Sequence, residues 1–117
     1  MKLCEEENTV KIYDLLYRLG AAATHTGFFH TAYAVRLAAE QPERLLLVTK
    51  WLYPDVAKHY GTNWRAVERN IRTTIQEIWK RCPETLSDMA GYPMTQAPRP
   101  AEFISILARH ISVIGAA

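Results

Sequence analysis

The chain has 117 residues and a mass of 13.4 kDa, so we expect a single domain over residues 1–117. Hydrophobic residues make up 49% and charged residues 22% of the chain, a balance typical of a folded globular protein and unlike that of a disordered one. The longest apolar runs fall far short of the roughly 20 residues of a membrane span. No signal-peptide pattern is present, and Cys4 and Cys82 lie far apart, so we expect a cytoplasmic protein with free thiols.

The net charge of +2 is unevenly distributed along the chain. Residues 1–49 carry five basic and six acidic side chains, and residues 83–117 carry two basic and three acidic ones. Residues 50–82 carry seven basic and three acidic side chains, a net charge of +4. A clustered basic segment suits a polyanionic partner. The alternative is an ordinary solvated helix face.

Apolar residues recur at helical spacing along the chain, and no alternating strand pattern of useful length interrupts them. The sequence therefore predicts an all-α fold, a compact domain of six or seven helices in which residues 1–8 are flexible. Glycine, proline and capping residues mark the helix ends. The predicted helices are one that ends before Gly20, then about 27–40, 43–52, 54–60, 63–81 and 84–90, and a last helix that starts at Pro100.

The longer helices each carry an apolar face that predicts which side chains enter the core. For the last helix an alternative stays open, an interface whose rim is formed by Arg99, Glu102 and Arg109. The predicted inward residues are Ile12, Leu15, Leu16 and Leu19 in the first helix; Phe29, Ala32, Val35 or Arg36, and Ala39 in the second; Leu45, Leu46, Val48 and Leu52 in the third; Val67, Ile71, Thr74 or Ile75, Ile78 and Trp79 in the fifth; and Phe103, Ile104, Leu107, Ile111 and Ile114 in the last.

A tight turn separates the helices predicted at 54–60 and 63–81, which indicates a helix-turn-helix over about residues 54–81. Ala57 is small, as is needed where two helices cross closely, and Gly61 supplies the positive φ that the turn requires. Val67 follows at a spacing that lets it pack back onto the shorter helix.

Polar side chains gather on the face of the long helix opposite its apolar stripe. On a recognition helix these side chains enter the major groove, where arginine bonds guanine and glutamate accepts a hydrogen bond from cytosine. The alternative is that the charges pair along the helix, for example Glu68 with Arg72 at i, i+4. The candidates for contact with bases are Arg65, Glu68, Arg69, Arg72 and Thr73.

Several short motifs together resemble the DNA-binding effector domains of the sporulation master response regulators. The similarity runs without gaps from about Ile12 to Arg81 and resumes near the end of the chain. The motifs are Leu52-Tyr53-Pro54-Asp55-Val56-Ala57-Lys58, Val67-Glu68-Arg69-Asn70-Ile71-Arg72, Ile78-Trp79, the glycines Gly20 and Gly27, Gly91-Tyr92, and Pro98 followed by Glu102-Phe103-Ile104.

The resemblance implies an all-helical domain that binds double-stranded DNA at short promoter boxes, often in tandem, with self-association on the DNA. It also implies contact with RNA polymerase or its sigma factor. Glu68, Arg69 and Arg72 match the family's contact positions on the recognition helix, and Lys58 matches a basic position on the preceding helix.

The chain departs from the family pattern in three ways. Arg65-Ala66 stands where the family has Ser-Arg, which moves the arginine about 100° around the helix. Thr73 stands where the family has histidine, so we expect a different base preference. The chain is too short for the family's receiver domain, so we expect either an excised domain or a stand-alone relative.

Residues near the motif supply candidates for contact with the sugar–phosphate backbone. For His59 an ordinary surface role is an alternative, and for Trp64 a hydrophobic staple at the start of the helix. The backbone candidates are Lys50, Lys58, His59, Asn63, Trp64, Lys80 and Arg81.

No catalytic, metal or cofactor site is legible in the sequence. The four histidines show no HxxxH or HExxH spacing, and no phosphate-cradling glycine loop is present. We therefore expect a sequence-specific transcription regulator and no enzyme, metal or cofactor. One alternative is a protein-interaction module that kept the fold and lost DNA reading, and another is a helical domain that binds a small molecule.

Overall fold

The computed structural model describes the backbone of residues 2–22 and 25–116, and the side chains of residues 8–22 and 25–111. Within these ranges the chain forms no strand, so the all-α prediction is confirmed. The elements are α1 (Lys2–Arg18), α2 (Thr26–Glu40), a 3₁₀-helix η1 (Pro42–Leu47), a π-helix η2 (Val48–Leu52), α3 (Tyr53–Tyr60), α4 (Trp64–Arg81), α5 (Pro83–Ala90) and α6 (Pro100–Ala116).

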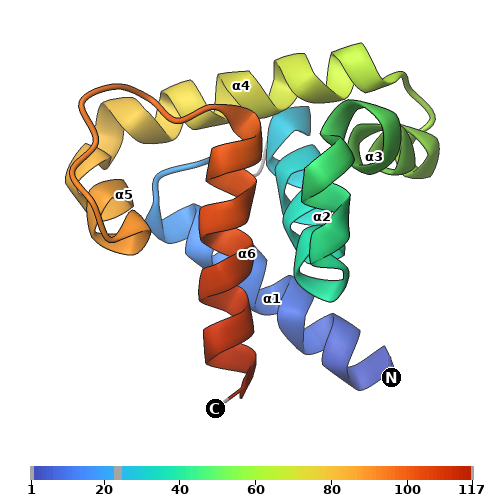
Figure 1. Ribbon diagram of the computed structural model, residues 1–117, viewed down its shortest axis with the longest axis horizontal. Helices are drawn as coiled ribbons and strands as arrows, with labels where there is room; N and C mark the ends of the chain where they lie inside the picture. The colour runs from blue at the N-terminus through green and yellow to red at the C-terminus, as the bar shows by residue number, and fades with distance from the viewer. Residues whose placement is uncertain (1, 23–24, 117) are drawn as a thin grey trace.

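The helix α4 lies across one side of the molecule, with α3 at one end and α5 at the other (Figure 1). Beneath it, α2 and α6 run transverse to its axis, and α1 lies below them (Figure 1). The beginning of α1 and the end of α6 lie on the side of the molecule away from α4 (Figure 1). One long face of α4 therefore points outward from the fold.

The helix α2 is central, because it packs against α1, α4 and α6. We expected Phe29 to face the core, and this is wrong: Phe29 is 36% exposed, whereas Phe28 is 1% exposed. Because neighbours surround α2, buried residues occupy most of its circumference, and a single apolar stripe does not predict which ones they are. The ring of Phe28 packs against Tyr13 and Tyr17 of α1, with centroids 5.5 and 5.3 Å apart.

The third predicted helix is also corrected by the structure. Pro42 opens it as expected, but it is wound as the 3₁₀-helix η1 followed by the π-helix η2. A 3₁₀-helix has 3.0 residues per turn, so a face counted at 3.6 residues per turn points the wrong way. Leu46, predicted to be inside, is 82% exposed and Leu47 is 51% exposed, whereas Leu52 is fully buried as predicted.

The apolar faces predicted for the other long helices form the core. Among them Leu16, Ile71 and Leu107 are completely buried, and Trp79 is half-buried at the edge of the cluster. The side chain of Ile114 lies outside the described residues. The flexibility expected of residues 1–8 stays a prediction; the backbone from Lys2 is helical, and the side chains of residues 1–7 are not described. No helix in the described ranges is both long and apolar enough to cross a membrane.

The helices α2 and α4 approach each other closely at Gly27. A methyl group at this position would lie 2.4 Å from both the Asn70 carbonyl oxygen and the Thr74 hydroxyl oxygen. Real side chains do not tolerate such a distance, so only glycine lets the two helices cross this closely.

We expect Gly27→Ala to lower the free energy of unfolding by about 1–3 kcal/mol, the usual cost of overpacking a filled contact. The sign is informative, because alanine in place of glycine inside a helix otherwise stabilises by up to about 1 kcal/mol. Urea denaturation of the wild type and the variant measures the change.

Adding Thr74→Ala removes the hydroxyl but leaves the Asn70 carbonyl in place. The double variant Gly27→Ala/Thr74→Ala should therefore remain destabilised relative to Thr74→Ala alone. Full recovery in the double variant would show that the backbone contact is not the constraint.

Candidate nucleic-acid interface

The turn between α3 and α4 has the geometry of a helix-turn-helix. Gly61 ends α3 in the left-handed region, with φ +67°, and the Thr62 N–H donates a hydrogen bond of 2.9 Å to the Ala57 carbonyl. Ala57 is buried where the two helices meet, and Val67 of α4 is completely buried. The small residue, the glycine and the aliphatic residue thus occupy the places that their spacing predicted.

Asn63 begins α4 as its N-cap. The side-chain oxygen of Asn63 accepts a hydrogen bond of 2.9 Å from the Ala66 N–H. This bond satisfies one of the backbone donors that the first turn of a helix leaves free. Trp64, in the same turn, is half-buried against the core, and the Arg65 guanidinium lies 5.4 Å from its ring centroid. A hydrophobic staple uses the residue before the N-cap, and Trp64 follows it, so the side chain packs against the core without forming a staple.

The outward face of α4 presents arginines without carboxylate partners. Arg65, Arg69 and Arg72 are exposed, and they lie within about 60° of one another around the helix axis at 100° per residue. Among the described side chains none of them forms an ion pair, so the pairing of Glu68 with Arg72 that the spacing allowed is not formed. Glu68 is half-buried at the edge of this face. The three guanidinium groups therefore keep their charge available to a ligand.

The other predicted contact residue, Thr73, is exposed and lies beside this face. Its hydroxyl donates a hydrogen bond of 3.1 Å to the Arg69 carbonyl one turn earlier. Both lone pairs of the hydroxyl oxygen and the methyl group remain outside that bond. Thr73 is thus able to contact a base edge by accepting a hydrogen bond or through its methyl group.

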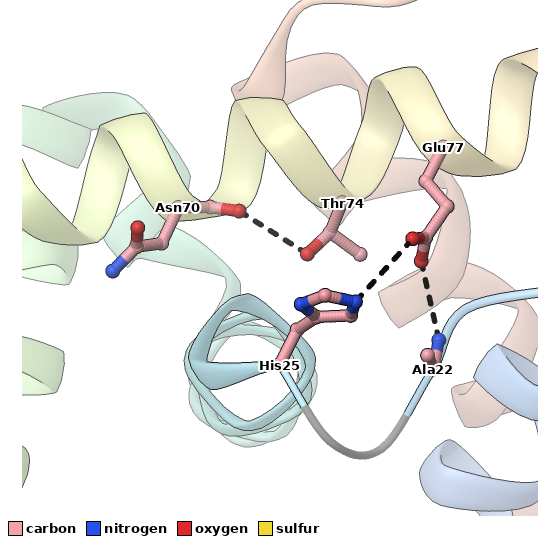
Figure 2. A network of polar contacts seen from close by, with 5 residues as sticks. All are labelled: Ala22, His25, Asn70, Thr74 and Glu77. Atoms are coloured by element: carbon pink, nitrogen blue, oxygen red, sulfur yellow. Dashed lines mark hydrogen bonds and ion pairs between the residues drawn. The ribbon is translucent and has the colours of Figure 1, made fainter.

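A polar network fastens the middle of α4 to the start of α2 (Figure 2). Glu77 accepts a hydrogen bond of 3.2 Å from the Ala22 N–H, and its second oxygen lies 3.9 Å from His25 Nε2. The Thr74 hydroxyl donates a hydrogen bond of 3.1 Å to the Asn70 carbonyl. Both oxygen atoms lie where Gly27 of α2 packs against α4. Because the network holds α4 from below, the outward face keeps a fixed orientation relative to the core.

His30 of α2 adds a buried contact to the same helix. Its Nδ1 lies 3.4 Å from the Asn70 side-chain nitrogen, which donates to it when the imidazole carries its proton on Nε2. The imidazole is 2% exposed, and its centroid is 5.0 Å from that of Tyr60. Burial lowers the pKa of His30 below 6.5, because the charged form loses its hydration.

Tyr53 is a second buried group whose pKa is affected by charges of α4. Burial and, less strongly, the Glu68 carboxylate raise the pKa of Tyr53 to about 12, and the Arg72 guanidinium opposes them. The charges of Glu68 and Arg72 on α4 therefore both affect the ionisation of Tyr53, the first residue of α3.

The structure divides the predicted backbone-contact residues into two groups. Lys50, Lys58 and His59 are exposed on or beside α3, near the N-terminal half of α4. Lys80 and Arg81 are exposed at the other end of α4, about 22 Å from Arg65 by the rise of the helix. The second group therefore does not share a contact region with the first.

Sequence reasoning missed the residues that orient α4. Asn70 and Glu77 lie seven positions apart, along one edge of the apolar stripe, and each contacts α2 or the turn before it. Polar residues seven positions apart, at the border of the apolar stripe of a helix, are the sequence pattern from which Asn70 and Glu77 could have been predicted. Their partners His25 and His30 carry no such signal.

The remaining candidate groups serve the fold. The Glu102 carboxylate accepts a hydrogen bond from the Tyr92 hydroxyl, and this bond raises the pKa of Tyr92. The Arg109 guanidinium donates a hydrogen bond of 3.3 Å to the Ala90 carbonyl. Two of the three proposed rim residues thus fasten the segment 91–99 and α5 to α6. Cys82 is a free thiol, whereas the side chain of Cys4 lies outside the described residues. In residues 8–22 and 25–111 no three histidine, cysteine, aspartate or glutamate side chains gather as metal ligands.

The fold presents a helix-turn-helix whose second helix, α4, carries an exposed basic face. A family model described as the sporulation initiation factor Spo0A C terminal matches residues 12–111. The chain belongs to this family, whose members are DNA-binding regulatory domains and are not an enzymatic family. The resemblance drawn from the sequence is thereby confirmed.

We expect Asn63→Ala to lower the free energy of unfolding by about 1 kcal/mol, because the cap on the Ala66 N–H is lost. Asn63→Asp keeps an acceptor in the same place and should retain the wild-type value. Thermal or urea denaturation of the three proteins measures the difference. Equal losses in both variants would contradict the capping role.

We expect the stability of the protein to fall as the pH drops below about 6.5, the ordinary pKa of histidine. Below this pH the unfolded chain binds a proton at His30 more readily than the folded protein does, because the pKa of His30 is lowered in the folded state. The slope from this one residue is at most about 1.4 kcal/mol per pH unit. His30→Gln keeps an acceptor for Asn70 and should show a shallower slope between pH 6.5 and 5. Parallel curves for the wild type and His30→Gln would contradict this assignment, and His110→Gln, on α6 outside this network, serves as the control.

Proposed function

We propose that the protein binds specific DNA sequences with the N-terminal half of α4 in the major groove. The observation that carries the proposal is the row of exposed, unpaired arginines Arg65, Arg69 and Arg72 on the outward face of a helix anchored from below. A major groove admits one α-helix, and arginine bonds the O6 and N7 atoms of guanine with both arms of its fork. Glu68 and Thr73 border this row and supply an acceptor and a methyl group.

Phosphate contacts on the flanks would set the register of the helix in the groove. The phosphates of one DNA strand would be contacted by Lys50, Lys58 and His59, which are exposed. Asn63 and Trp64 lie at the N-terminal end of α4. Lys80 and Arg81 reach a phosphate only where the duplex follows α4 along its whole length. We therefore rank the group around α3 above the pair at the end of α4.

We further propose that the bound sites are short promoter boxes and that binding regulates transcription in the bacterial cytoplasm. Family membership supports this part of the proposal. Contact with RNA polymerase or its sigma factor, and self-association of copies on tandem boxes, follow from the same membership as proposals. The replacement of the family's Ser-Arg by Arg65-Ala66 predicts a shifted base preference within the box.

The second candidate function is a protein-interaction module that kept the helices and lost DNA reading. The exposed leucines of η1, with Leu46 at 82% and Leu47 at 51%, favour it, because large apolar side chains at a surface often mark a contact with another protein. The unpaired arginines of α4 are not explained by this alternative.

Fluorescence anisotropy with a duplex carrying the family's box and a scrambled duplex, at two salt concentrations, tests the proposal. A preference for the box supports specific reading. Salt-steep binding to both duplexes alike supports backbone contacts with an altered code. Absence of binding to either duplex at low salt rejects the proposal and favours the interaction module.

Within this assay we expect Arg69→Ala to weaken binding to the best site by about 1–3 kcal/mol and to relax the preference at one base pair. The loss follows from removing a bidentate contact to one base. The matched control is Arg99→Ala, which removes an exposed arginine from the segment before α6 and should change the affinity little. An unchanged affinity in Arg69→Ala would show that this face of α4 is not in the groove.

A further inference from the structure

A groove of about 410 Å³ lies between α2, η1 and α3. None of the residues that line it belongs to α4, so it is separate from the face proposed to read bases. Its volume falls within the range of about 300–1,000 Å³ that is usual for small-molecule sites. It is lined by Tyr33, Leu37, Arg44, Asp55, Lys58 and His59.

Hydrogen-bond donors in this groove lack partners. Among the described residues the Lys58 ammonium and the His59 ring nitrogens form no hydrogen bond or ion pair. Arg44 Nε is buried and has no hydrogen-bond partner. Because the Arg44 Nε has almost no surface of its own, a ligand in the groove would meet the exposed donors of Lys58 and His59 and the charge of Arg44.

The arginine and the histidine are held in place by their neighbours. Arg44 Nη2 lies 3.5 Å from an Asp55 carboxylate oxygen, and its guanidinium stands 5.7 Å from the centroid of a Trp51 ring. His59 stacks on Tyr33 with a centroid distance of 4.1 Å and an interplanar angle of 14°. Side chains fixed in this way lose little entropy when a ligand binds.

The charge of the groove selects the class of ligand. Arg44 and Lys58 contribute two positive charges and Asp55 one negative charge, so the groove is cationic. Asp55 engages the end of the Arg44 guanidinium, and the Arg44 Nε is covered by protein atoms, so the free donors of the groove are those of Lys58 and His59. Arginine, lysine and histidine around one small volume are the donors that phosphate oxygens take in proteins.

We propose that this groove is a binding site for a phosphate group, with Lys58 and His59 as its donors and the positive charge of Arg44 and the ring of Tyr33 beside them. The phosphate has two available sources. One is a free phosphate monoester such as a nucleoside monophosphate. The other is the backbone of the duplex beside α3, and this source rests on the proposed function.

The first arm of the test uses the full chain labelled with ¹⁵N and titrated with inorganic phosphate and with adenosine monophosphate. Saturable shifts of the Arg44 Nε–H signal and of the Tyr33 and His59 amides are expected, while sodium chloride at equal ionic strength leaves them in place. Arg44→Met should weaken binding by about tenfold or more, because one of the two positive charges that line the groove is lost. The control Arg18→Met removes an arginine that is also paired with an aspartate, on α1 away from the groove, and should leave the titration unchanged.

The second arm measures duplex binding by anisotropy as a function of salt. If the phosphate is that of DNA, Arg44→Met lowers the affinity for box and scrambled duplex alike and reduces the salt slope by about one. Lys58→Met, at an exposed position where folding is not at risk, should do the same. Arg18→Met should again behave as the wild type.

Binding in either arm that is lost with Arg44→Met supports the site and identifies its source. If Arg44→Met fails to fold, Lys58→Met decides both arms in its place. The inference is overturned if free phosphate shifts none of these signals and the groove variants bind duplex as Arg18→Met does. A wild type that binds no duplex rejects the proposed function alone, because the titration with free phosphate still decides the inference.

Discussion

The contact between α2 and α4 at Gly27 is the constraint on which the rest of the structure depends. With no side chain at this position, the Asn70 carbonyl and the Thr74 hydroxyl come against the backbone of α2. The apolar stripe of α4 is then buried along the central helix, and Glu77 and His30 fasten its edges. The same contact that completes the core therefore turns the opposite face of α4 to the solvent.

This arrangement separates the two demands placed on α4. Its inner face stabilises the fold through completely buried residues such as Val67, Ile71 and Ile78. Its outer face carries positive charges that pair with no carboxylate in the described part of the chain, so they contribute little to stability. Those charges are explained by a polyanionic ligand, which is consistent with the family to which the chain belongs.

Sequence reasoning succeeded where a residue acts through its own backbone or through helical periodicity. Gly61 as the turn and the apolar stripe of α4 are local features, and the structure has them as predicted. It failed at Phe29 and Leu46, where the surroundings of α2 and the 3₁₀ winding of η1 decide what is buried. Neither effect is encoded in a 3.6-residue period.

The sequence by itself determined the helices, the turn between α3 and α4 and the basic character of the segment that contains them, because propensity, capping and charge are properties of neighbouring residues. Only the tertiary structure decided which arginines stay unpaired and how α4 is anchored. It also decided that Arg44, Lys58 and His59 share one groove. These relations join residues far apart in the chain, and their distances follow from how α2 packs against its neighbours.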